Sequence, residues 1–580
     1  MKKDNLNHLR HSTAHLLAAA VTSLWPKAKP TLGPPIEDGF YYDFADLDIS
    51  EKDLPKIEKK MKQIVKSWES FEKIEISGLE AEKIFKDNPF KIELIKELKK
   101  ANKKITLYES GKFLDLCQGG HVKSPSKKIK FFKLLSVAGA YWRGDEKNPM
   151  LTRIYGTVFP QKKELDQYLW RLEETKKRDH KKIGQQLGLF IIPKEVGPGL
   201  LIWTPKGAVI RREIENFIIK EQTKRGYQHV YSPHIGRKSL WVKSGHWDLY
   251  RDKMYSSMKI DKEDYLVKPM NCPMHMMVYK SLLRSYRDLP LRIAENATVY
   301  RYEKSGELSG MVRVRYITQD DAHIFCREDQ VVDEFIGVLD YVNYLFKVFG
   351  ISDYYFRLSL RDPKNKNKYL GEDSVWNEAE EKIESAVHKL KLSYEKVEGE
   401  AAFYGPKLDA MVKDALGREW QCATIQVDFM LPERFNLEYI DKKGRAKRPI
   451  LIHRAPLGSI ERFVGLLIEH YEGNFPTWLT PIQVKVLPIS KRHQKYGEEI
   501  EEKLKKEGIR TEIDIRNATL PAKIRDAQIE KVSYMLIVGD REEKNKTVRE
   551  RSRSGQDFGE IKLEAFIKKI KKEIESKSLA

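Results

Sequence analysis

Cysteine is scarce in this chain of 580 residues: it contains Cys117, Cys272, Cys326 and Cys422, and no two of them form a C-x-x-C pair. Such sparse cysteine argues against a disulfide scaffold and predicts a reducing cytoplasmic environment. No apolar run approaches the length of a membrane span, and the first ten residues lack the apolar core of a signal peptide. We therefore expect a cytoplasmic protein without a membrane partner.

Charged residues are abundant, and basic residues outnumber acidic ones. The chain has 106 Lys and Arg against 85 Asp and Glu, a formal net charge of +21, and 41% hydrophobic residues. This balance favours a polyanionic partner such as RNA or DNA. A lysine-rich genome would produce a similar excess, and charge alone does not separate the two explanations. The length predicts three or four domains.

Residues 1–160 have the pattern of an α+β domain. A predicted N-terminal helix places His11 and His15 one turn apart on the same face. Further along, Cys117 and His121 form a C-x-x-x-H in a glycine-rich bend. These four side chains have the types of a zinc site, and they would equally suit a polar hydrolytic pocket without metal.

Three further segments follow. The highly charged stretch 161–182 predicts a linker helix or an RNA-facing surface. Residues 183–480 form the largest predicted unit, and its amphipathic helix Lys206–Arg225 has an apolar stripe that suits a core or a subunit interface. In residues 481–580, short apolar strands alternate with helical patterns, which is typical of a small α/β domain, and the Lys and Arg content suits RNA binding.

The most informative stretch is Tyr300–Phe325, which predicts two strands joined by a loop with two glycines. In the second strand, from about Met311, one face would carry the polar residues at odd positions: Arg313, Arg315, Gln319, Asp321 and His323. Arg301 and Glu303 repeat the spacing on the first strand. Arginine suits phosphate, and an Asp beside a His suits an amine or a metal. The alternative is a solvated strand face with scattered charges.

Two other segments carry candidate ligands. Cys272 and His275 stand three residues apart, which suits two metal ligands or a buried cysteine beside a turn proline. A strand predicted further along puts Gln421 on one side and Thr424 and Gln426 on the other.

The strand Ile450–Arg454 is predicted to turn into the helix Ile460–Tyr471. This turn places Ser459 and Arg462 at a helix N-terminus. Because the helix dipole and free N–H groups favour anions there, these two residues are candidates for contact with an anionic ligand.

Taken in their order along the chain, these segments resemble those of a class II aminoacyl-tRNA synthetase and, within that class, the threonyl-tRNA synthetase family. All three class II motifs are present, at the helix-to-strand segment that ends at Pro233, at Arg301-Tyr302-Glu303 through Arg313, and at Gly458–Phe463. The runs Thr318–His323 (TQDDAH) and Asn271–Pro273 (NCP) are the most specific. The resemblance extends over almost all of the chain.

The resemblance implies a multidomain α+β and α/β fold. An antiparallel catalytic sheet (183–480) would be joined by a linker helix (161–182) to an N-terminal α+β editing domain (1–160), with a C-terminal α/β anticodon-binding domain (481–580). The implied activity is the two-step ligation of L-threonine to tRNA(Thr) by a homodimer that uses ATP with Mg²⁺, with hydrolytic editing of seryl-tRNA(Thr). The small ubiquitin-like domain that often precedes the editing domain is expected to be missing.

The resemblance also implies roles for single residues. One zinc ion per subunit would be held by Cys272, His323 and His453, and not by His275. ATP would be bound by Arg301, Glu303, Arg313, Gln421 and Arg462, of which the three arginines form the catalytic set. Threonine would be bound by Gln319, Asp321, Tyr404, Thr424, Gln426 and Ser459. Editing would use His11, His15, Lys91, Asp115, Cys117 and His121, and anticodon reading Asn517, Arg525, Glu542 and Arg551.

The sequence departs from the family pattern at two sites. The usual C-R-G-P-H is Cys117-Gln118-Gly119-Gly120-His121 here, and the family's editing pocket is described without a catalytic metal. Where the family has a phenylalanine that stacks on adenine, this chain has Ile317 on the predicted cleft face. An RNA-binding paralogue without catalysis and a stand-alone hydrolase of mischarged tRNA are the alternative functions, and the intact class II arginines argue against both.

Overall fold

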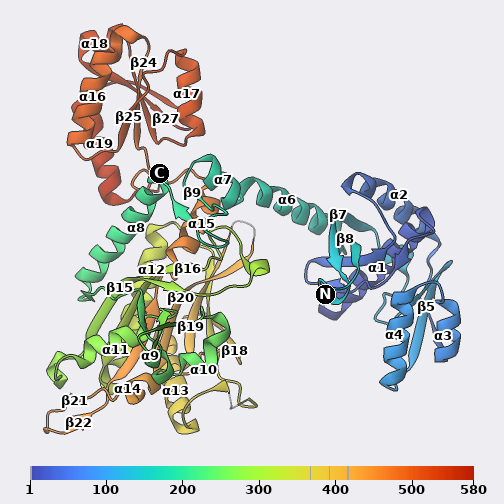
Figure 1. The fold of residues 1–580 in the computed structure, drawn as a ribbon. Coiled ribbons are helices and arrows are strands. Elements are labelled where there is room, and N and C mark those ends of the chain that lie inside the picture. Colours follow the sequence, from blue (N-terminus) through green and yellow to red (C-terminus); the bar gives the residue numbers. More distant parts are fainter. Residues whose placement is uncertain (1–2, 366–367, 391, 415–416, 580) are drawn as a thin grey trace. The chain divides into compact units, whose positions relative to one another are not determined.

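The structure is a computed structural model that describes residues 3–365, 368–390, 392–414 and 417–579. The chain divides into two compact units, Met1–Glu174 and Thr175–Ala580, and each is described by itself (Figure 1). The division falls inside helix α6 (Lys162–Arg178), in the charged stretch for which a linker helix was predicted. Among the described residues, no helix is both long and apolar enough to cross a membrane.

The first unit is built around helix α1 (Lys3–Leu24), whose alanine-rich middle is buried. Small alanine side chains let this helix pack closely against an antiparallel sheet of order β1-β3-β8-β7, with β2 beside β3. The strands of this sheet are β1 (Lys29–Pro30), β2 (Pro35–Ile36), β3 (Gly39–Ala45), β7 (Phe131–Tyr141) and β8 (Met150–Phe159). Helix α2 (Leu54–Ile64) contributes to the same core through its apolar face.

A smaller layer completes the first unit. Strands β4 (Glu72–Ile76), β5 (Ile105–Ser110) and β6 (Phe113–Leu116) form an antiparallel sheet. Helices α3 (Gly78–Ile84) and α4 (Pro89–Lys100) share a small core with it. A serine and an asparagine N-cap begin these two helices, which places Lys91 in the first turn of α4.

The second unit contains an eight-stranded sheet of order β11-β15-β16-β23-β20-β19-β17-β18, antiparallel except for its outermost pairs. In that order the strands are Gln228–His229, Leu291–Tyr300, Tyr316–Cys326, Ile450–Ala455, Glu419–Asp428, Lys407–Lys413, Tyr354–Leu360 and Tyr394–Glu398. This arrangement confirms the predicted antiparallel sheet, which we call the catalytic sheet after the role that the resemblance implies.

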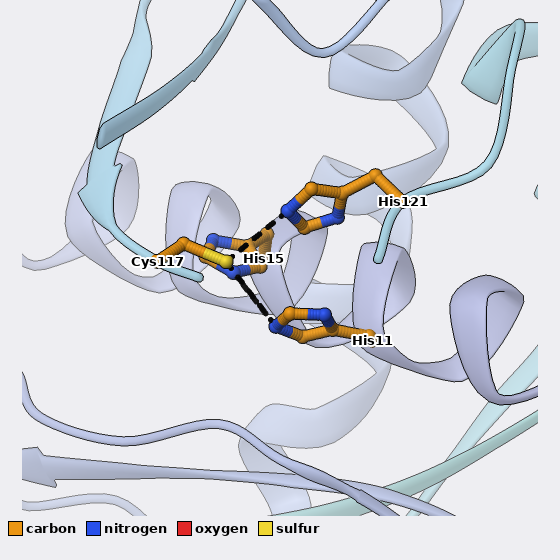
Figure 2. Close-up of side chains that lie close together, drawn as sticks. All are labelled: His11, His15, Cys117 and His121. Atoms are coloured by element: carbon orange, nitrogen blue, oxygen red, sulfur yellow. Dashed lines mark hydrogen bonds between the residues drawn. The ribbon is translucent and has the colours of Figure 1, made fainter. Parts of the chain in front are cut away.

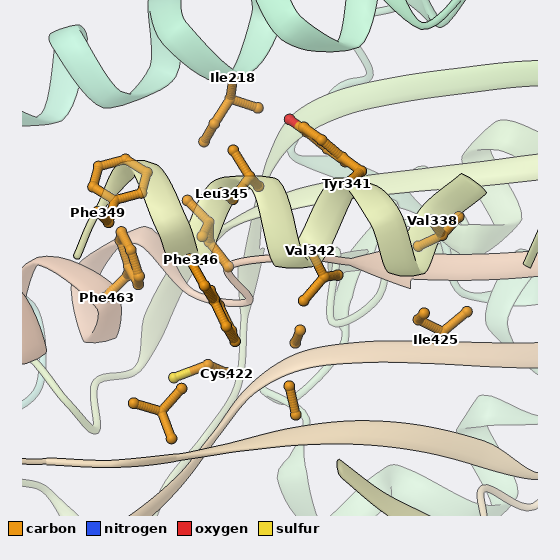
Figure 3. Close-up of a cluster of buried hydrophobic side chains, with 14 of the residues drawn as sticks. Ile218, Val338, Tyr341, Val342, Leu345, Phe346, Phe349, Cys422, Ile425 and Phe463 are labelled. Carbon is orange, nitrogen blue, oxygen red and sulfur yellow. The ribbon is translucent and has the colours of Figure 1, made fainter. Parts of the chain in front are cut away.

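One face of this sheet is covered by apolar helices. The main ones are α8 (Pro205–Lys224), α12 (Val331–Val348) and α15 (Ile460–Tyr471), which share one hydrophobic core with the strands. Figure 3 shows α12 between Ile218 of α8 on one side and Cys422 and Ile425 of β20 on the other. Because this face is filled with side chains, the polar side chains of the strands are left on the opposite face, where the candidate site lies.

The end of the chain forms an α/β domain with a five-stranded sheet of order β25-β24-β26-β27-β28. The predicted strands are present as β24 (Val484–Pro488), β25 (Thr511–Ile513) and β26 (Tyr534–Val538), and the predicted helices as α16 (Gln494–Lys506) and α17 (Leu520–Ile529). Four elements were not predicted: α18 (Asp540–Asn545), β27 (Thr547–Ser552), β28 (Asp557–Lys562) and α19 (Leu563–Ser576). The two strands were missed because they are rich in charge and lack an apolar run.

The prediction for Tyr300–Phe325 was partly wrong. Strand β15 ends at Tyr300 and β16 begins at Tyr316, so that Arg301, Glu303, Arg313 and Arg315 lie in the connecting loop. The backbone N–H of Arg315 donates to Gly199 O at 2.7 Å, whereas its carbonyl still accepts from the Arg301 N–H at 2.9 Å, so the ladder stops at this residue. Within β16 the predicted alternation holds, since the even positions 318–324 are buried.

Candidate functional site

Three arginines from separate segments approach one another at one end of the catalytic sheet. Arg301 follows β15, Arg313 precedes β16, and Arg462 lies in the first turn of α15. Arg462 donates through Nε to Val312 O (3.0 Å) and through Nη1 to Gln421 O (3.2 Å). Burial, together with the positive charges of Arg301 and Arg313, lowers the pKa of Arg462. Such converging positive charge suits a polyphosphate.

Glu303 orders the loop that carries two of these arginines. Its Oε2 accepts from Lys253 Nζ (3.0 Å) and from Arg313 Nη2 (3.2 Å). Arg301 is held separately, through Nε to Pro269 O at 3.4 Å. Glu303 and Arg313 therefore hold each other in place, Arg301 is held by a separate partner, and Glu303 supplies an acceptor beside the positive charges.

Gln421 contradicts the simple alternation predicted for its strand. A β-bulge in the β19–β20 pair leaves Cys422 without an opposite residue, because Ala410 faces Ala423 and Met411 faces Gln421. Gln421 Nε2 consequently donates to Thr424 Oγ1, at 2.8 Å. Strict alternation would place Gln421 and Thr424 on opposite faces of the strand. The bulge brings both to the same face, so their predicted separation is wrong.

The residues implied for threonine lie on neighbouring strands. His323, His453 and Gln426 stand in one row across β16, β23 and β20. Gln426 Oε1 accepts from Tyr404 OH at 2.6 Å. Thr424 donates to Asp409, which sequence reasoning did not identify.

Two further implied threonine ligands come from β16. Gln319 forms an isolated bridge with Ser459, at the start of α15. Asp321 lies two residues before His323, and burial raises the pKa of its carboxyl group. Ile317 is on the same face, opposite Val299, at the position expected to approach adenine. The implied residues therefore gather on one face of three adjacent strands.

Three buried side chains of the same sheet region form a candidate metal centre. Cys272 begins helix α11 (Cys272–Lys280), and its ligand atom lies within 4.8 Å of those of His323 and His453. His323 Nδ1 is engaged by His275 Nδ1 at 2.8 Å, and its Nε2 is buried without any hydrogen-bond partner. A buried nitrogen left without a partner beside a thiol and a second imidazole fits a metal ion.

The other contacts of these histidines favour the same interpretation. His453 Nε2 and Asp428 Oδ2 are 2.9 Å apart, which leaves His453 Nδ1 as its ligand atom. Carboxylate and imidazole partners of this kind orient metal-binding histidines. His275 therefore lies behind His323, in contact with it and with Glu295, rather than in the Cys272–His323–His453 set. Asp428 was missed in the sequence, although it follows Thr424 and Gln426 at strand spacing.

Asp428→Asn is expected to weaken metal binding by the candidate centre about 10–100-fold, since the amide loses the charge that orients His453. Asn keeps the oxygen that caps the following helix turn at Met430 and Leu431. Equilibrium competition with a chromophoric chelator measures the affinity.

The matched control is Asp441→Asn, in an exposed hairpin away from this centre. An unchanged zinc affinity in the Asp428→Asn variant would show that the carboxylate does not support the metal centre.

The first unit contains a separate polar cluster. His11 and His15 of α1 meet Cys117 and His121 of the loop after β6, as Figure 2 shows. Cys117 Sγ lies 3.5 Å from His11 Nε2 and 3.3 Å from His121 Nε2, and the two α1 histidines approach within 3.3 Å. Burial raises the pKa of Cys117 to about 11 and lowers the pKa of His121 to about 2. These residues adjoin a cavity of about 850 Å³.

A buried ion pair lies beside this cluster. Lys91 Nζ is 2.6 Å from Asp115 Oδ1, and both side chains are inaccessible to solvent. Tyr42 OH donates to Asp115 Oδ2 at 2.5 Å, which adds a residue that sequence reasoning missed. Asp115 also faces His15 Nδ1, at 3.3 Å. All six implied editing residues are therefore close together.

The residues implied for anticodon reading differ in exposure. Asn517 is exposed in the turn before α17, and Arg525 is exposed within α17. Glu542 is buried, and its carboxylate accepts from the Gly539 N–H at 3.0 Å, at the start of α18. Arg551, on β27, has its Nε buried. The side chains of Asn517 and Arg525 are therefore accessible to a ligand, whereas Glu542 supports the fold.

Three family models match successive parts of the chain. The "tRNA synthetase class II core domain (G, H, P, S and T)" matches residues 255–471, and the "Anticodon binding domain" matches 483–573. The "Threonyl and Alanyl tRNA synthetase second additional domain" matches residues 105–155. These matches cover all strands of the eight-stranded sheet except β11, most of the C-terminal α/β domain and part of the first unit.

Whole-chain relatives decide the family. A threonine–tRNA ligase of Oceanobacillus iheyensis is 48% identical over 99% of this chain and 90% of its own length. The chain belongs to the threonine–tRNA ligase family. A second member, from Anoxybacillus flavithermus, is 50% identical over 98% of this chain and 89% of its own.

A solved structure agrees with this family. It is described as the RNA binding domain of threonyl-tRNA synthetase from Cryptosporidium parvum Iowa II, and it is 38% identical to this chain. The structural match covers 69% of the present chain and 99% of the solved chain, with a TM-score of 0.65. The predicted resemblance to the threonyl-tRNA synthetase family is confirmed.

Proposed function

We propose that the chain ligates L-threonine to tRNA(Thr) in two steps. The threonine carboxylate attacks the α-phosphorus of ATP, which is bound with Mg²⁺, and pyrophosphate leaves. A ribose hydroxyl of the terminal adenosine of the tRNA then attacks the carbonyl carbon of the adenylate, and AMP leaves. The observation that carries this proposal is the convergence of Arg301, Arg313 and Arg462 beside the polar face of the catalytic sheet.

The arginines have a defined task in the first step. Negative charge is redistributed over the phosphoryl oxygens as the α-phosphorus is attacked, and preorganised guanidinium groups stabilise it. Glu303 and Gln421 lie against Arg313 and Arg462 respectively, where they bind ATP and keep the arginines in place.

Cys272, His323 and His453 would hold one zinc ion per subunit. When bound, zinc would supply coordination positions for the amino group and the side-chain hydroxyl of threonine. Gln319, Asp321, Tyr404, Thr424, Gln426 and Ser459 surround the amino acid. A site built around a hydroxyl discriminates against valine, because valine leaves the polar groups of the site without partners.

Pyrophosphate–ATP exchange tests the proposed ligase activity. Exchange is expected with threonine and near background with valine, in the presence of Mg²⁺ and zinc. An RNA-binding paralogue or a stand-alone hydrolase would show no exchange with any amino acid. Absence of threonine-dependent exchange in folded protein would therefore exclude the proposed activity.

The protein must also reject serine, which differs from threonine by only one methyl group. A difference of this size supports discrimination of only about 10–200-fold in one binding site. We assign hydrolysis of seryl-tRNA(Thr) to the first unit. The buried cluster of His11, His15, Lys91, Asp115, Cys117 and His121 beside its large cavity supports this assignment.

A homodimer is the proposed assembly. Apolar side chains are exposed around the first class II motif, where Tyr231 has 90% of its surface accessible and Ile235 has 47%. Such residues indicate a surface that another protein covers. The C-terminal domain would bind the tRNA anticodon, with Asn517, Arg525, Glu542 and Arg551 as the candidate positions.

A further inference from the structure

A buried histidine from a distant part of the second unit contacts the loop that carries Arg313. His180 begins helix α7 (His180–Gln186), which packs against α15, and only 2% of its surface is exposed (Figure 1). Its Nε2 accepts a hydrogen bond from the Met311 N–H at 3.2 Å. Because Met311 stands two residues before Arg313, His180 gives this loop a fixed point close to a proposed ATP ligand.

Glu469 of α15 sets the tautomer of His180. Its Oε1 lies 2.7 Å from His180 Nδ1, and its Oε2 accepts from Arg418 Nη2 at 2.6 Å. A carboxylate paired with a guanidinium is ionised and can only accept, so the hydrogen lies on His180 Nδ1 and Nε2 keeps its lone pair. The imidazole is therefore held in the neutral form that can accept from the Met311 N–H.

A metal ion is the alternative occupant of this cluster. Asp179, His180 and Glu469 offer ligand atoms within 4.8 Å of one another. However, both nitrogens of His180 and both carboxylate oxygens of Glu469 already have partners. Asp179 Oδ1 accepts from the Lys181 N–H at 2.8 Å. Hydrogen bonds therefore account for these side chains without a cation.

Two glycines let the loop and α15 come close to this histidine. Gly310 has a φ of +51°, and a Cβ at this position would collide with His180 Nε2. A Cβ on Gly465 of α15 would meet Val312 Cγ1 at 3.0 Å. Larger residues at either position would push the loop away from its present place.

The segment that His180 holds is also bound by a catalytic arginine. Arg462 Nε donates to the carbonyl of Val312, the residue after Met311, at 3.0 Å. Ser309 O accepts from the N–H groups of Val312 (3.1 Å) and Arg313 (3.3 Å). A displacement of Met311 would therefore disturb both Arg313, through the turn, and Arg462, through the carbonyl of Val312.

We propose that His180 is a positioning residue for adenylate formation. Through the Met311 N–H it holds the loop where Arg313 and Arg462 meet the phosphates of ATP, while Glu469 holds the imidazole. This inference rests on the proposed ATP contacts of the two arginines. Because His180 acts through the loop, its loss changes the use of ATP and leaves the KM for threonine unaltered.

Two amide substitutions separate this role from packing. His180→Gln can place an acceptor near the position of Nε2, whereas His180→Asn reaches only the position of Nδ1 and keeps the contact with Glu469. In pyrophosphate–ATP exchange, His180→Asn and His180→Ala are expected to lower kcat/KM for ATP about 10–100-fold, and His180→Gln less than about threefold, since a small misplacement of reacting groups is costly. Equal losses in His180→Gln and His180→Asn would overturn the proposal.

Two further variants complete this experiment. His388→Gln is the matched control, because His388 is an exposed histidine of α13 (Asp373–Lys389) in the same unit, and it should keep the wild-type kcat/KM for ATP. Gly310→Ala leaves His180 intact and displaces the loop from it, so it should lower kcat/KM for ATP as His180→Asn does. If the His180 variants did not fold, a wild-type value in Gly310→Ala would overturn the proposal.

Hydrogen–deuterium exchange of the Met311 amide gives a readout that does not depend on activity. In His180→Asn and His180→Ala this amide loses its acceptor, so it should take up deuterium at least about tenfold faster than in wild type and His180→Gln. Equal protection in all four proteins would overturn the role of the contact. If wild type shows no threonine-dependent pyrophosphate–ATP exchange, the proposed ligase activity fails, and the Met311 amide still decides whether His180 holds the loop.

Discussion

Arg462→Ala is expected to lower threonine-dependent pyrophosphate–ATP exchange about 10²–10³-fold, mainly through kcat. The side chain is pinned by two backbone carbonyls, those of Val312 and Gln421, and it lies beside two other arginines. A preorganised cation of this kind stabilises charge in the transition state more than in the bound substrate. Steady-state exchange at saturating threonine and varied ATP measures the effect.

Two variants make this result specific. Arg462→Lys keeps the charge and loses the fork that contacts both carbonyls, so an intermediate loss is expected. Arg445→Ala is the control, because Arg445 pairs with Asp441 in an exposed hairpin. If Arg462→Ala retained most of its kcat and raised only the KM for ATP, Arg462 would bind the nucleotide without stabilising the reacting phosphoryl group.

His121→Ala is expected to lower deacylation of seryl-tRNA(Thr) about 10²–10⁴-fold, the range typical of a lost general acid–base group. His121 contacts Cys117 and Ser12, and its ring stacks on Phe71 with centroids 4.0 Å apart. The measurement is hydrolysis of preformed seryl-tRNA(Thr) by metal-free protein.

Threonine activation provides the internal control for this variant. His121 belongs to the first unit and the class II motifs belong to the second, so exchange with threonine should remain within about twofold of wild type. Mischarged tRNA should then accumulate when serine is supplied. Deacylation at the wild-type rate would place the hydrolytic site elsewhere.

Long elements with a clear period were predictable from the sequence. Helices α1, α8 and α15 were expected close to their observed bounds, because each combines an apolar stripe with a proline or a cap. The period of two in β16 also placed Gln319, Asp321 and His323 on one face, since strand geometry fixes that spacing.

Other features depend on contacts between distant residues. The segments of Arg301 and Arg313 were predicted as strand because their alternating charges imitate one, whereas the Arg315 N–H donates to Gly199 and the Arg313 N–H to Ser309. Tyr42 and Asp428 looked like ordinary strand residues, and only the fold brings Tyr42 to Asp115 and Asp428 to His453. The roles of the ligand sets came from resemblance to a family, because spacing alone suggested His275, three residues after Cys272, as a ligand.

The bulge at Cys422 sets the register of the N-terminal part of β20 against β19. Cys422 itself is buried among apolar side chains, and burial raises the pKa of its thiol to about 12. If the bulge were lost with Cys422 retained, Cys422 would pair with Met411 and Gln421 with Val412, and residues 419–421 would each turn to the opposite face while 423–428 kept theirs. Gln421 would then leave Thr424 and the carbonyl contact to Arg462. A register shift of one residue can therefore disable this site although every residue that contacts substrate is still present.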